Sequence, residues 1–228
     1  MILRRIVFGE PKPGGAAFSA LLAGLDESVS YCNRSGPLQH DRVTDLPFAI
    51  PLLGLDFEHP APLSFVRADP PDSDPYGIFA WHHSALYLQG ARAALQGDHV
   101  EAARLCDAIY DRGEPEPWNV GPNEDSGVVW AIRREGSKAF VVFRGSITKL
   151  DWLRDIISID PAQTIKRIMH HDTFGTIWGG FLIGVPEAWE KIAGAIGDAS
   201  EVIFTGHSLG AARADFAAGF AMLNRGAK

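Results

Sequence analysis

The sequence predicts an α/β protein in which a β-sheet is flanked by helices. A β-branched and aromatic run, 202–205, passes through a glycine-containing turn directly into an alanine-rich helical pattern. Two further strand-like runs, at 127–134 and 138–143, flank the three-residue turn 135–137. Helical patterns precede and follow these strands, and such alternation is typical of α/β architecture.

Length and charge narrow the possible functions. The 228 residues fit one domain, or one domain with an extension. A net charge of −7 gives no basis for nucleic-acid binding, which needs clustered Lys and Arg. The two cysteines, Cys32 and Cys106, could form one disulfide, but the sequence favours two buried thiols.

Nothing in the sequence indicates a membrane anchor or a metal. The apolar run before Glu10 is too short for a signal peptide, and no other stretch is long enough to span a membrane. We therefore expect a cytoplasmic location by default. His82, His83 and His99 have no second ligand at metal-like spacing, so we expect neither a metal nor another cofactor.

Residues 1–75 form the first predicted unit, a proline-rich irregular extension that packs on the core without carrying chemistry. Within it, residues 47–53 are apolar but bracketed by prolines, which favours an arm lying against the core. The second unit, 76–228, is the α/β domain. It begins with helical spacing over 78–92, followed by a second helix that Asp98 caps and Gly113 ends.

The hairpin comes next along the chain. Its second run, 138–143, is almost continuously apolar, as expected of a strand buried on both faces, and it leads straight into Arg144-Gly145-Ser146. A short amphipathic pattern follows at 147–157. This pattern fits a lid over an apolar pocket as well as a plain surface helix. The candidate lid residues are Leu150, Trp152, Leu153 and Ile156.

The last third of the chain predicts helix, strand, turn and helix. A helix through 188–196 leads to the strand at 201–205, and the final helix starts at Leu209. That helix is apolar nearly all round, which indicates burial, and Gly226 is its expected C-cap.

The turn between that strand and that helix has the pattern of a nucleophile elbow. Gly206 and Gly210 stand two residues before and two after Ser208. Side chains at the two glycine positions would collide with neighbouring backbone, and the serine between them is expected in a strained conformation. Such a turn presents a serine hydroxyl at the tip of the sheet, beside the N–H groups of the next helix.

Four short segments occur in an order that resembles the class 3 (fungal-type) lipases of the α/β-hydrolase superfamily. They are Phe143-Arg144-Gly145-Ser146, Asp151-Trp152 with Asp155, Gly180-Phe181, and Thr205-Gly206-His207-Ser208-Leu209-Gly210-Ala211-Ala212. The resemblance covers roughly residues 76–228. It implies an α/β-hydrolase-type sheet and a lipase or esterase acting on an acylglycerol or another carboxylic ester.

The resemblance also implies roles for single residues. Ser208 would be the acylating nucleophile. Leu209, through its N–H, and Ser146, through its N–H and its hydroxyl, would form the oxyanion hole. The segment around 148–157 would be the lid or its hinge, which suits an apolar acyl substrate.

One departure from the family bears on activity. In this superfamily an acid and then a histidine follow the serine in sequence. After Ser208 the only carboxylate is Asp215, about 10 Å up the elbow helix, and no histidine follows. Asp215 is therefore too far away to orient a base beside Ser208. The candidate bases are His207, beside the nucleophile, and the pair His170 and His171.

Three interpretations follow, and all of them keep the fold. The sheet is C-terminally incomplete, and a longer reading frame or a second chain supplies the remaining strands, acid and histidine. Alternatively, the chain is a catalytically inactive lipase-fold protein that binds lipid or a partner. A third possibility is a complete enzyme with an unusual base.

Overall fold

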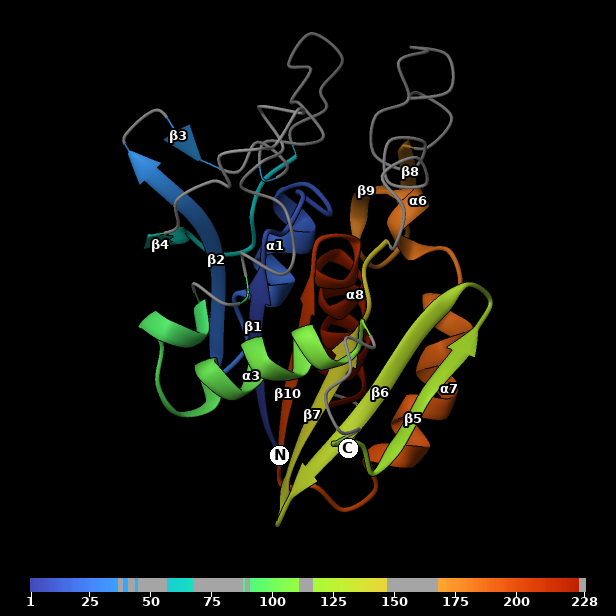
Figure 1. Cartoon of the computed structure of the whole chain (residues 1–228). Coiled ribbons are helices and arrows are strands. Elements are labelled where there is room, and N and C mark those ends of the chain that lie inside the picture. Colours follow the sequence, from blue (N-terminus) through green and yellow to red (C-terminus); the bar gives the residue numbers. More distant parts are fainter. Residues whose placement is uncertain are drawn as a thin grey trace, which may run out of the picture.

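A mixed β-sheet forms the middle of the molecule, with helices on both of its faces (Figure 1). The structure is a computed structural model, and it describes residues 1–36, 39–40, 44, 57–67, 88, 91–110, 117–146 and 168–225. Among these residues the sheet has eight strands in the order β3-β2-β1-β10-β7-β6-β5, with β4 paired to β2. The strands are β1 Ile2–Phe8, β2 Glu27–Gly36, β3 Gln39–His40, β4 Leu63–Arg67, β5 Val120–Asp125, β6 Val128–Glu135, β7 Lys138–Phe143 and β10 Glu201–His207.

The β10 strand lies between two parallel neighbours. On one side it pairs with β7, and on the other with β1, so that Phe8 stands opposite His207. Beyond β1 the sheet continues in parallel through β2 and β4. Beyond β7 it becomes antiparallel through β6 and β5. All strands from β7 to β4 therefore end at one edge of the sheet, the edge at which β10 ends.

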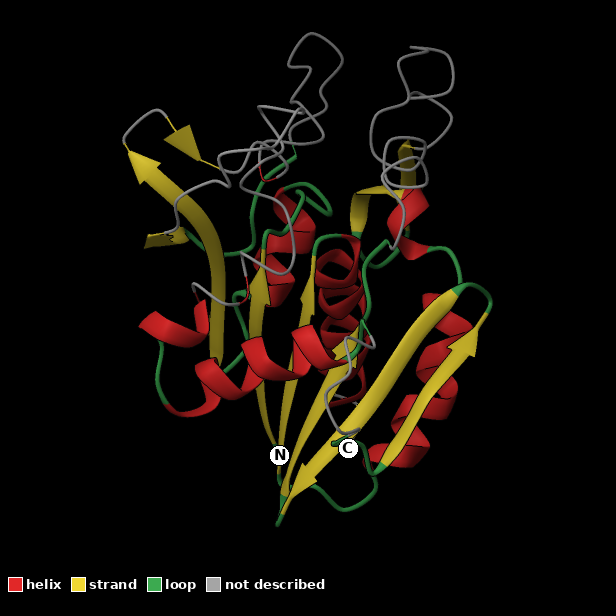
Figure 2. Cartoon of the chain, viewed as in Figure 1, coloured by secondary structure: helices red, strands yellow, loops and turns green. Residues whose placement is uncertain are grey.

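The helices divide into two layers (Figure 2). Helix α3 covers one face with a small apolar cluster, while α1, α6, α7 and α8 cover the other face with a larger one. The bounds are α1 Ala16–Leu22, α3 Gly97–Ala108, α6 Gly179–Leu182, α7 Val185–Ile196 and α8 Leu209–Arg225. A separate two-stranded sheet, β8 Ile168–His171 with β9 Gly175–Trp178, lies beyond the strand ends.

The sequence predicted the second half of the sheet well. The hairpin is β6 and β7 in antiparallel register, and five of the six residues of β7 are buried. The predicted helix over 188–196 is α7, which begins three residues earlier, at Val185. Helix α8 is buried around most of its circumference, as its composition predicted. The α/β architecture is confirmed.

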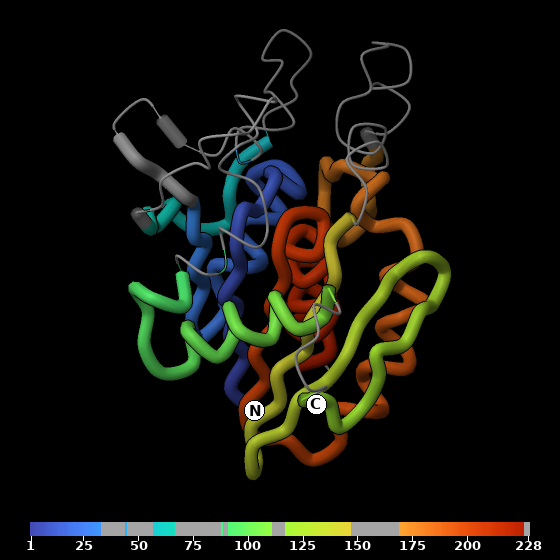
Figure 3. Tube along the Cα trace, in the orientation of Figure 1, coloured from blue at the N-terminus to red at the C-terminus, as the bar shows by residue number. Residues whose placement is uncertain are grey.

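The structure corrects the prediction for the start of the chain. Residues 2–8 are not part of an irregular extension but form β1, next to β10, and residues 27–36 form β2 (Figure 3). The prediction failed because Arg4 and Arg5 interrupt the apolar pattern of the strand. Arg5 is nevertheless fully buried, since ion pairs neutralise its charge.

Smaller predictions have mixed outcomes. The N-cap of helix α3 is Gln96 rather than Asp98, because the helix starts at Gly97, two residues earlier than predicted. Both cysteines are free and buried, as expected. Several predicted features lie outside the described residues: the arm at 47–53, most of the helix at 78–92, the helix stop at Gly113, the boundary at 75/76, the C-cap at Gly226 and the lid at 147–157.

In the part of the chain that the structure describes, no helix combines the length and the apolar character needed to cross a membrane.

Candidate active site

The turn between β10 and α8 holds its serine in a left-handed backbone conformation. Ser208 has a φ of 60°, and its side chain is almost completely buried. Its carbonyl oxygen accepts a hydrogen bond from the N–H of Ala211 at 2.9 Å, which starts the helix immediately. Positive φ is uncommon for a residue with a side chain, and such strain is concentrated at functional sites.

The two glycines of the turn are required by space. A Cβ atom on Gly206 would lie 2.8 Å from the backbone nitrogen of Ala211. On Gly210 it would lie 2.9 Å from the backbone nitrogen of Gly145. Both distances are shorter than the contacts that real Cβ atoms make, and moving the backbone atoms aside would cost free energy. Gly210 thus allows the chain after β7 to pass directly over the first turn of α8.

That crossing segment, Arg144-Gly145-Ser146, lies against the nucleophile candidate. A Cβ on Gly145 would come within 2.6 Å of the carbonyl oxygen of His207 and 3.2 Å of the Cβ of Ser208. The Oγ of Ser146, one residue further, is buried and has no hydrogen-bond partner among the described residues. The structure therefore brings Ser146, Ser208 and the N-terminus of α8 to one place. Their spacing in the sequence alone could not show this.

The strand β1 borders the turn on its other side. The N–H of Ser208 donates to the carbonyl oxygen of Phe8 at 3.0 Å. Two residues beyond Phe8, Glu10 is fully buried. The elbow is thus enclosed by the ends of β7 and β1, strands that lie more than a hundred residues apart in sequence.

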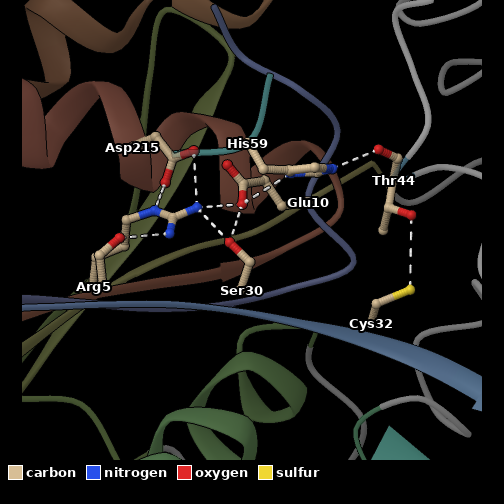
Figure 4. Close-up of polar contacts among 8 residues, drawn as sticks. Arg5, Glu10, Ser30, Cys32, Thr44, His59 and Asp215 are labelled. Atoms are coloured by element: carbon tan, nitrogen blue, oxygen red, sulfur yellow. Dashed lines mark hydrogen bonds and ion pairs between the residues drawn. The ribbon is translucent and has the colours of Figure 1, made fainter. Parts of the chain in front are cut away.

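A buried polar cluster starts at this end of β1 (Figure 4). Arg5 donates to the carboxylates of both Glu10 and Asp215, and its Nη2 also reaches the Oγ of Ser30 at 2.9 Å. Ser30 donates to the same Glu10 carboxylate at 2.5 Å. The Nδ1 of His59 lies 3.7 Å from Glu10 Oε2. One guanidinium therefore joins Asp215 of α8 to Glu10 and Ser30 in the N-terminal part of the chain.

The two carboxyl groups of this cluster differ in proton affinity. Burial favours the neutral form of Glu10, but the Arg5 guanidinium and hydrogen bonds outweigh burial and lower its pKa well below the usual range. Burial raises the pKa of Asp215 well above its ordinary value, and the negative charge of Glu10 adds to that rise. The cluster therefore consists of a charged Arg5, an ionised Glu10 and an Asp215 that retains its proton to higher pH.

His59 also makes a contact outside the cluster. Its Nε2 lies 2.7 Å from the carbonyl oxygen of Thr44, so this nitrogen carries the proton in the present arrangement. Its Nδ1 is buried without a hydrogen bond in the described structure, and so is Oε1 of Glu10. With the proton on Nε2, Nδ1 is an acceptor, so it makes no hydrogen bond with the Glu10 carboxylate, whose oxygens are acceptors as well.

The three candidate bases named from the sequence lie elsewhere. His207 points to the α3 side of the sheet, and its Nδ1 is 3.2 Å from the hydroxyl of Tyr110. His171 stacks on Phe174, and its Nδ1 accepts from the N–H groups of residues 173 and 174. His170 is exposed in β8. None of these contacts joins a histidine to a carboxylate.

Sequence reasoning missed Arg5, Glu10 and His59. A signal was present, because Ile6-Val7-Phe8-Gly9 is an apolar run ending in glycine, like the run before Gly206. The prolines that follow it obscured the strand. The candidate lid residues Leu150, Trp152, Leu153 and Ile156 lie outside the described residues. Within the described ranges, no group of three metal-ligating side chains is found.

Residues 140–226 match the family model of Lipase (class 3). No curated protein and no solved structure matches the chain. The matched segment contains most of β7, the β10–α8 turn and all of α8, so the similarity to class 3 lipases covers the candidate nucleophile and the segment that crosses it. A match to this lipase family suggests a lipid ester hydrolase function. The matched residues do not include β1, β2 and β4, which form the other side of the same sheet.

Proposed function

We propose that the chain is a serine ester hydrolase that cleaves a lipid or another carboxylic ester through an acyl-enzyme on Ser208. The observation that carries the proposal is the strained backbone of Ser208, held at a strand-to-helix turn against Gly145. Backbone strain of this kind persists only where the surrounding structure enforces it. Similarity to class 3 lipases over residues 140–226 supports the same chemistry.

In the first step, the Ser208 oxygen attacks the ester carbonyl carbon and loses its proton to a base. The carbonyl oxygen becomes an oxyanion, which the N–H of Leu209 and the N–H and hydroxyl of Ser146 stabilise. Each such donor is worth about 3 kcal/mol when it is preorganised for the transition state. The buried Ser146 hydroxyl has no hydrogen-bond partner among the described residues, which supports this role, because a buried donor without a partner is costly unless a ligand uses it.

The tetrahedral intermediate then collapses. The bond from carbon to the leaving alcohol oxygen breaks, and the protonated base returns its proton to that alcohol. Water attacks the acyl-enzyme in the same way, which releases the carboxylic acid and restores the Ser208 hydroxyl. These reaction steps require three kinds of protein group: the nucleophile, the oxyanion donors and a base.

The test is covalent labelling with a fluorophosphonate, together with hydrolysis of short-chain p-nitrophenyl esters. Wild-type protein should be labelled and turn over ester, whereas Ser208→Ala should do neither. Ser200→Ala is the matched control, because Ser200 is exposed just before the same strand. If folded wild-type protein neither reacts nor hydrolyses ester, the proposal fails and the inactive lipid-binding alternative replaces it.

The lid remains part of the proposal. Leu150, Trp152, Leu153 and Ile156 would cover the acyl site, so activity should be higher on aggregated than on dissolved ester. Equal rates on a triacylglycerol emulsion and on a monomeric ester, compared at matched concentrations, would contradict a lid at 147–157. Replacing Trp152 and Leu153 by serine should remove the preference while leaving the rate on dissolved ester unchanged.

A further inference from the structure

Three strands that precede the nucleophile in sequence occupy the sheet positions beyond it. Starting at β10 and moving away from β7, the sheet continues with β1, β2 and β4, all in parallel. In the α/β-hydrolase order, the strands that carry the acid and the histidine follow the nucleophile in the chain. Here the corresponding side of the sheet is built from residues 2–67.

The end of α8 and the start of β1 lie side by side. Arg225, in the last turn of α8, binds Asp26 Oδ2 at 2.9 Å, and the same oxygen accepts the N–H of Leu3 at 2.8 Å. A short connection from α8 to β1 would therefore give β10–α8–β1, two parallel strands joined by a helix that packs on both. That is the ordinary βαβ unit.

This arrangement brings the N-terminal loops to the candidate nucleophile. Parallel strands end at the same edge of a sheet, and Phe8 is hydrogen-bonded to Ser208 at that edge. Glu10 follows two residues later, and the Nδ1 of His59 lies 3.7 Å from its carboxylate. Three other histidines contact other groups: His207 contacts Tyr110, His171 contacts the N–H groups of residues 173 and 174, and His99 contacts Tyr31 and Glu27.

We propose that the chain is a circular permutant of the serine–acid–histidine order and that His59 is the general base for Ser208. This inference rests on the proposed function. A histidine whose Nδ1 faces an ionised carboxylate keeps Nε2 available to accept a serine proton. The Glu10 carboxylate is the anionic group that the described residues place beside that Nδ1, and Arg5 and Ser30 hold it there.

The proton path requires one rearrangement. In the present arrangement Nε2 carries a proton and faces the carbonyl oxygen of Thr44. For catalysis the ring proton moves to Nδ1, which then donates a hydrogen bond to the Glu10 carboxylate. Nε2 leaves the carbonyl oxygen of Thr44 and accepts a hydrogen bond from the Ser208 hydroxyl. Catalytic hydrogen bonds are often long or misaligned before substrate binds. No atom is gained or lost, since the proton only changes ring nitrogens.

The first experiment compares fluorophosphonate labelling rates of wild type, His59→Ala, Ser208→Ala and the control His99→Ala. His59→Ala should slow labelling by about 10³- to 10⁴-fold, as loss of a triad member does. Added imidazole should restore part of the rate in His59→Ala and none in Ser208→Ala. If His59→Ala fails to fold, His59→Asn takes its place in the experiment, because asparagine keeps a polar side chain but has no basic nitrogen to accept the serine proton.

The outcomes separate the two proposals. Wild-type rates in folded His59 variants, with no labelling of Ser208→Ala, would overturn the base and leave the hydrolase proposal standing. No labelling of wild type would sink the hydrolase proposal itself. Loss of labelling in His171→Ala, with His59→Ala unaffected, would likewise overturn the assignment to His59.

A rearranged chain tests the permutation. Residue 228 is joined to residue 1 by a glycine-serine linker, and the chain is opened within residues 68–87, between β4 and the residues that lead into α3. The rearranged protein should fold cooperatively and label at close to the wild-type rate. Failure to fold would contradict the proximity of α8 and β1, and a matched permutant opened between β6 and β7 provides the control for a disrupted hairpin.

Discussion

The two sides of the sheet differ in how clearly their strands can be recognised in the amino-acid sequence. On the β7 side, an apolar hairpin, a glycine-rich turn and an alanine-rich helix follow one another, and the chain from residue 140, within β7, to residue 226 matches a lipase family model. On the β1 side, arginines interrupt the strand and prolines follow it. Yet β1 and β7 are equivalent in space, since each pairs in parallel with β10. The position of a strand in the sheet is therefore independent of its place in the chain.

Among the largest expected effects on stability is that of replacing Arg5, which joins the two sides. Arg5→Met removes the only cation within reach of the Glu10 and Asp215 carboxylates in the described cluster. Breaking a buried ion pair by removing one partner typically costs about 3–5 kcal/mol of unfolding free energy. Urea denaturation would measure the loss. A change below about 1 kcal/mol would show that the cluster does not link β1 to α8.

The two carboxyl groups should respond differently to neutralisation. Burial raises the pKa of Asp215 and lowers its preference for the charged form, so Asp215→Asn should cost less than Glu10→Gln, which removes the charge that Arg5 needs. We expect about 1 kcal/mol for the first and about 3 kcal/mol for the second at neutral pH.

The same pair gives opposite pH dependences. The lowered pKa of Glu10 stabilises the fold above the unfolded-state value, about 4.3, and this stability is lost as the pH falls. The raised pKa of Asp215 stabilises the fold at low pH, and this stability is lost as the pH rises. Relative to wild type, the stability cost of Glu10→Gln should therefore be complete above about pH 4.3 and shrink as the pH falls below it, whereas Asp215→Asn should become less costly as the pH rises above about 3.9. Urea titrations on both sides of pH 4 would measure both trends, and the same trend in the two variants would contradict the assignment.

A double-mutant cycle between Phe18 and Phe216 tests whether the two regions share one core. Phe18 belongs to α1 and Phe216 to α8, and their rings stack with centroids 4.8 Å apart. Each change to alanine should cost about 3–5 kcal/mol, with a coupling of about 0.5–1.5 kcal/mol between them. Thermal unfolding of the four proteins gives the coupling. Strict additivity would mean that α1 is packed independently of α8.

The smallest effect is expected at Arg225→Ala. The ion pair of Arg225 with Asp26 is more than one-third exposed on both sides. Exposed pairs contribute about 0–1 kcal/mol, and salt reduces even that. Urea denaturation at low and high salt should show a small difference that salt abolishes. A large loss would indicate that this contact, rather than the buried cluster, holds α8 next to β1.

Sequence reasoning reached the nucleophile turn because its chemistry is local. Gly206, Ser208 and Gly210 lie within five residues, and the collisions that exclude other residues arise within that turn and the segment after β7. The contact between Gly145 and Ser208 was suggested by the resemblance to class 3 lipases and not by spacing. Local patterns thus predicted the β7 side correctly.

The base and the N-terminal strands could not be found in this way. The pairing of Glu10 with His59 depends on how β1 and the loop before β4 fold over one edge. Arg5 looked like a surface residue, and its pairing with Glu10 and with Asp215, 210 positions away, allows it to be buried. Reading the chain in order also suggested that the partners of Ser208 must follow it, whereas strands β1 and β2 precede it.

The most direct measurement is a crystal structure of the protein after reaction with a fluorophosphonate. The account predicts phosphorus bonded to Ser208 Oγ, and a phosphoryl oxygen within about 3 Å of the N–H of Leu209 and of Ser146. It also predicts that the Nε2 of His59 has left Thr44 and lies within hydrogen-bonding reach of the Ser208 oxygen. An adduct on another residue, or an adduct on Ser208 with a different histidine beside it, would contradict the account.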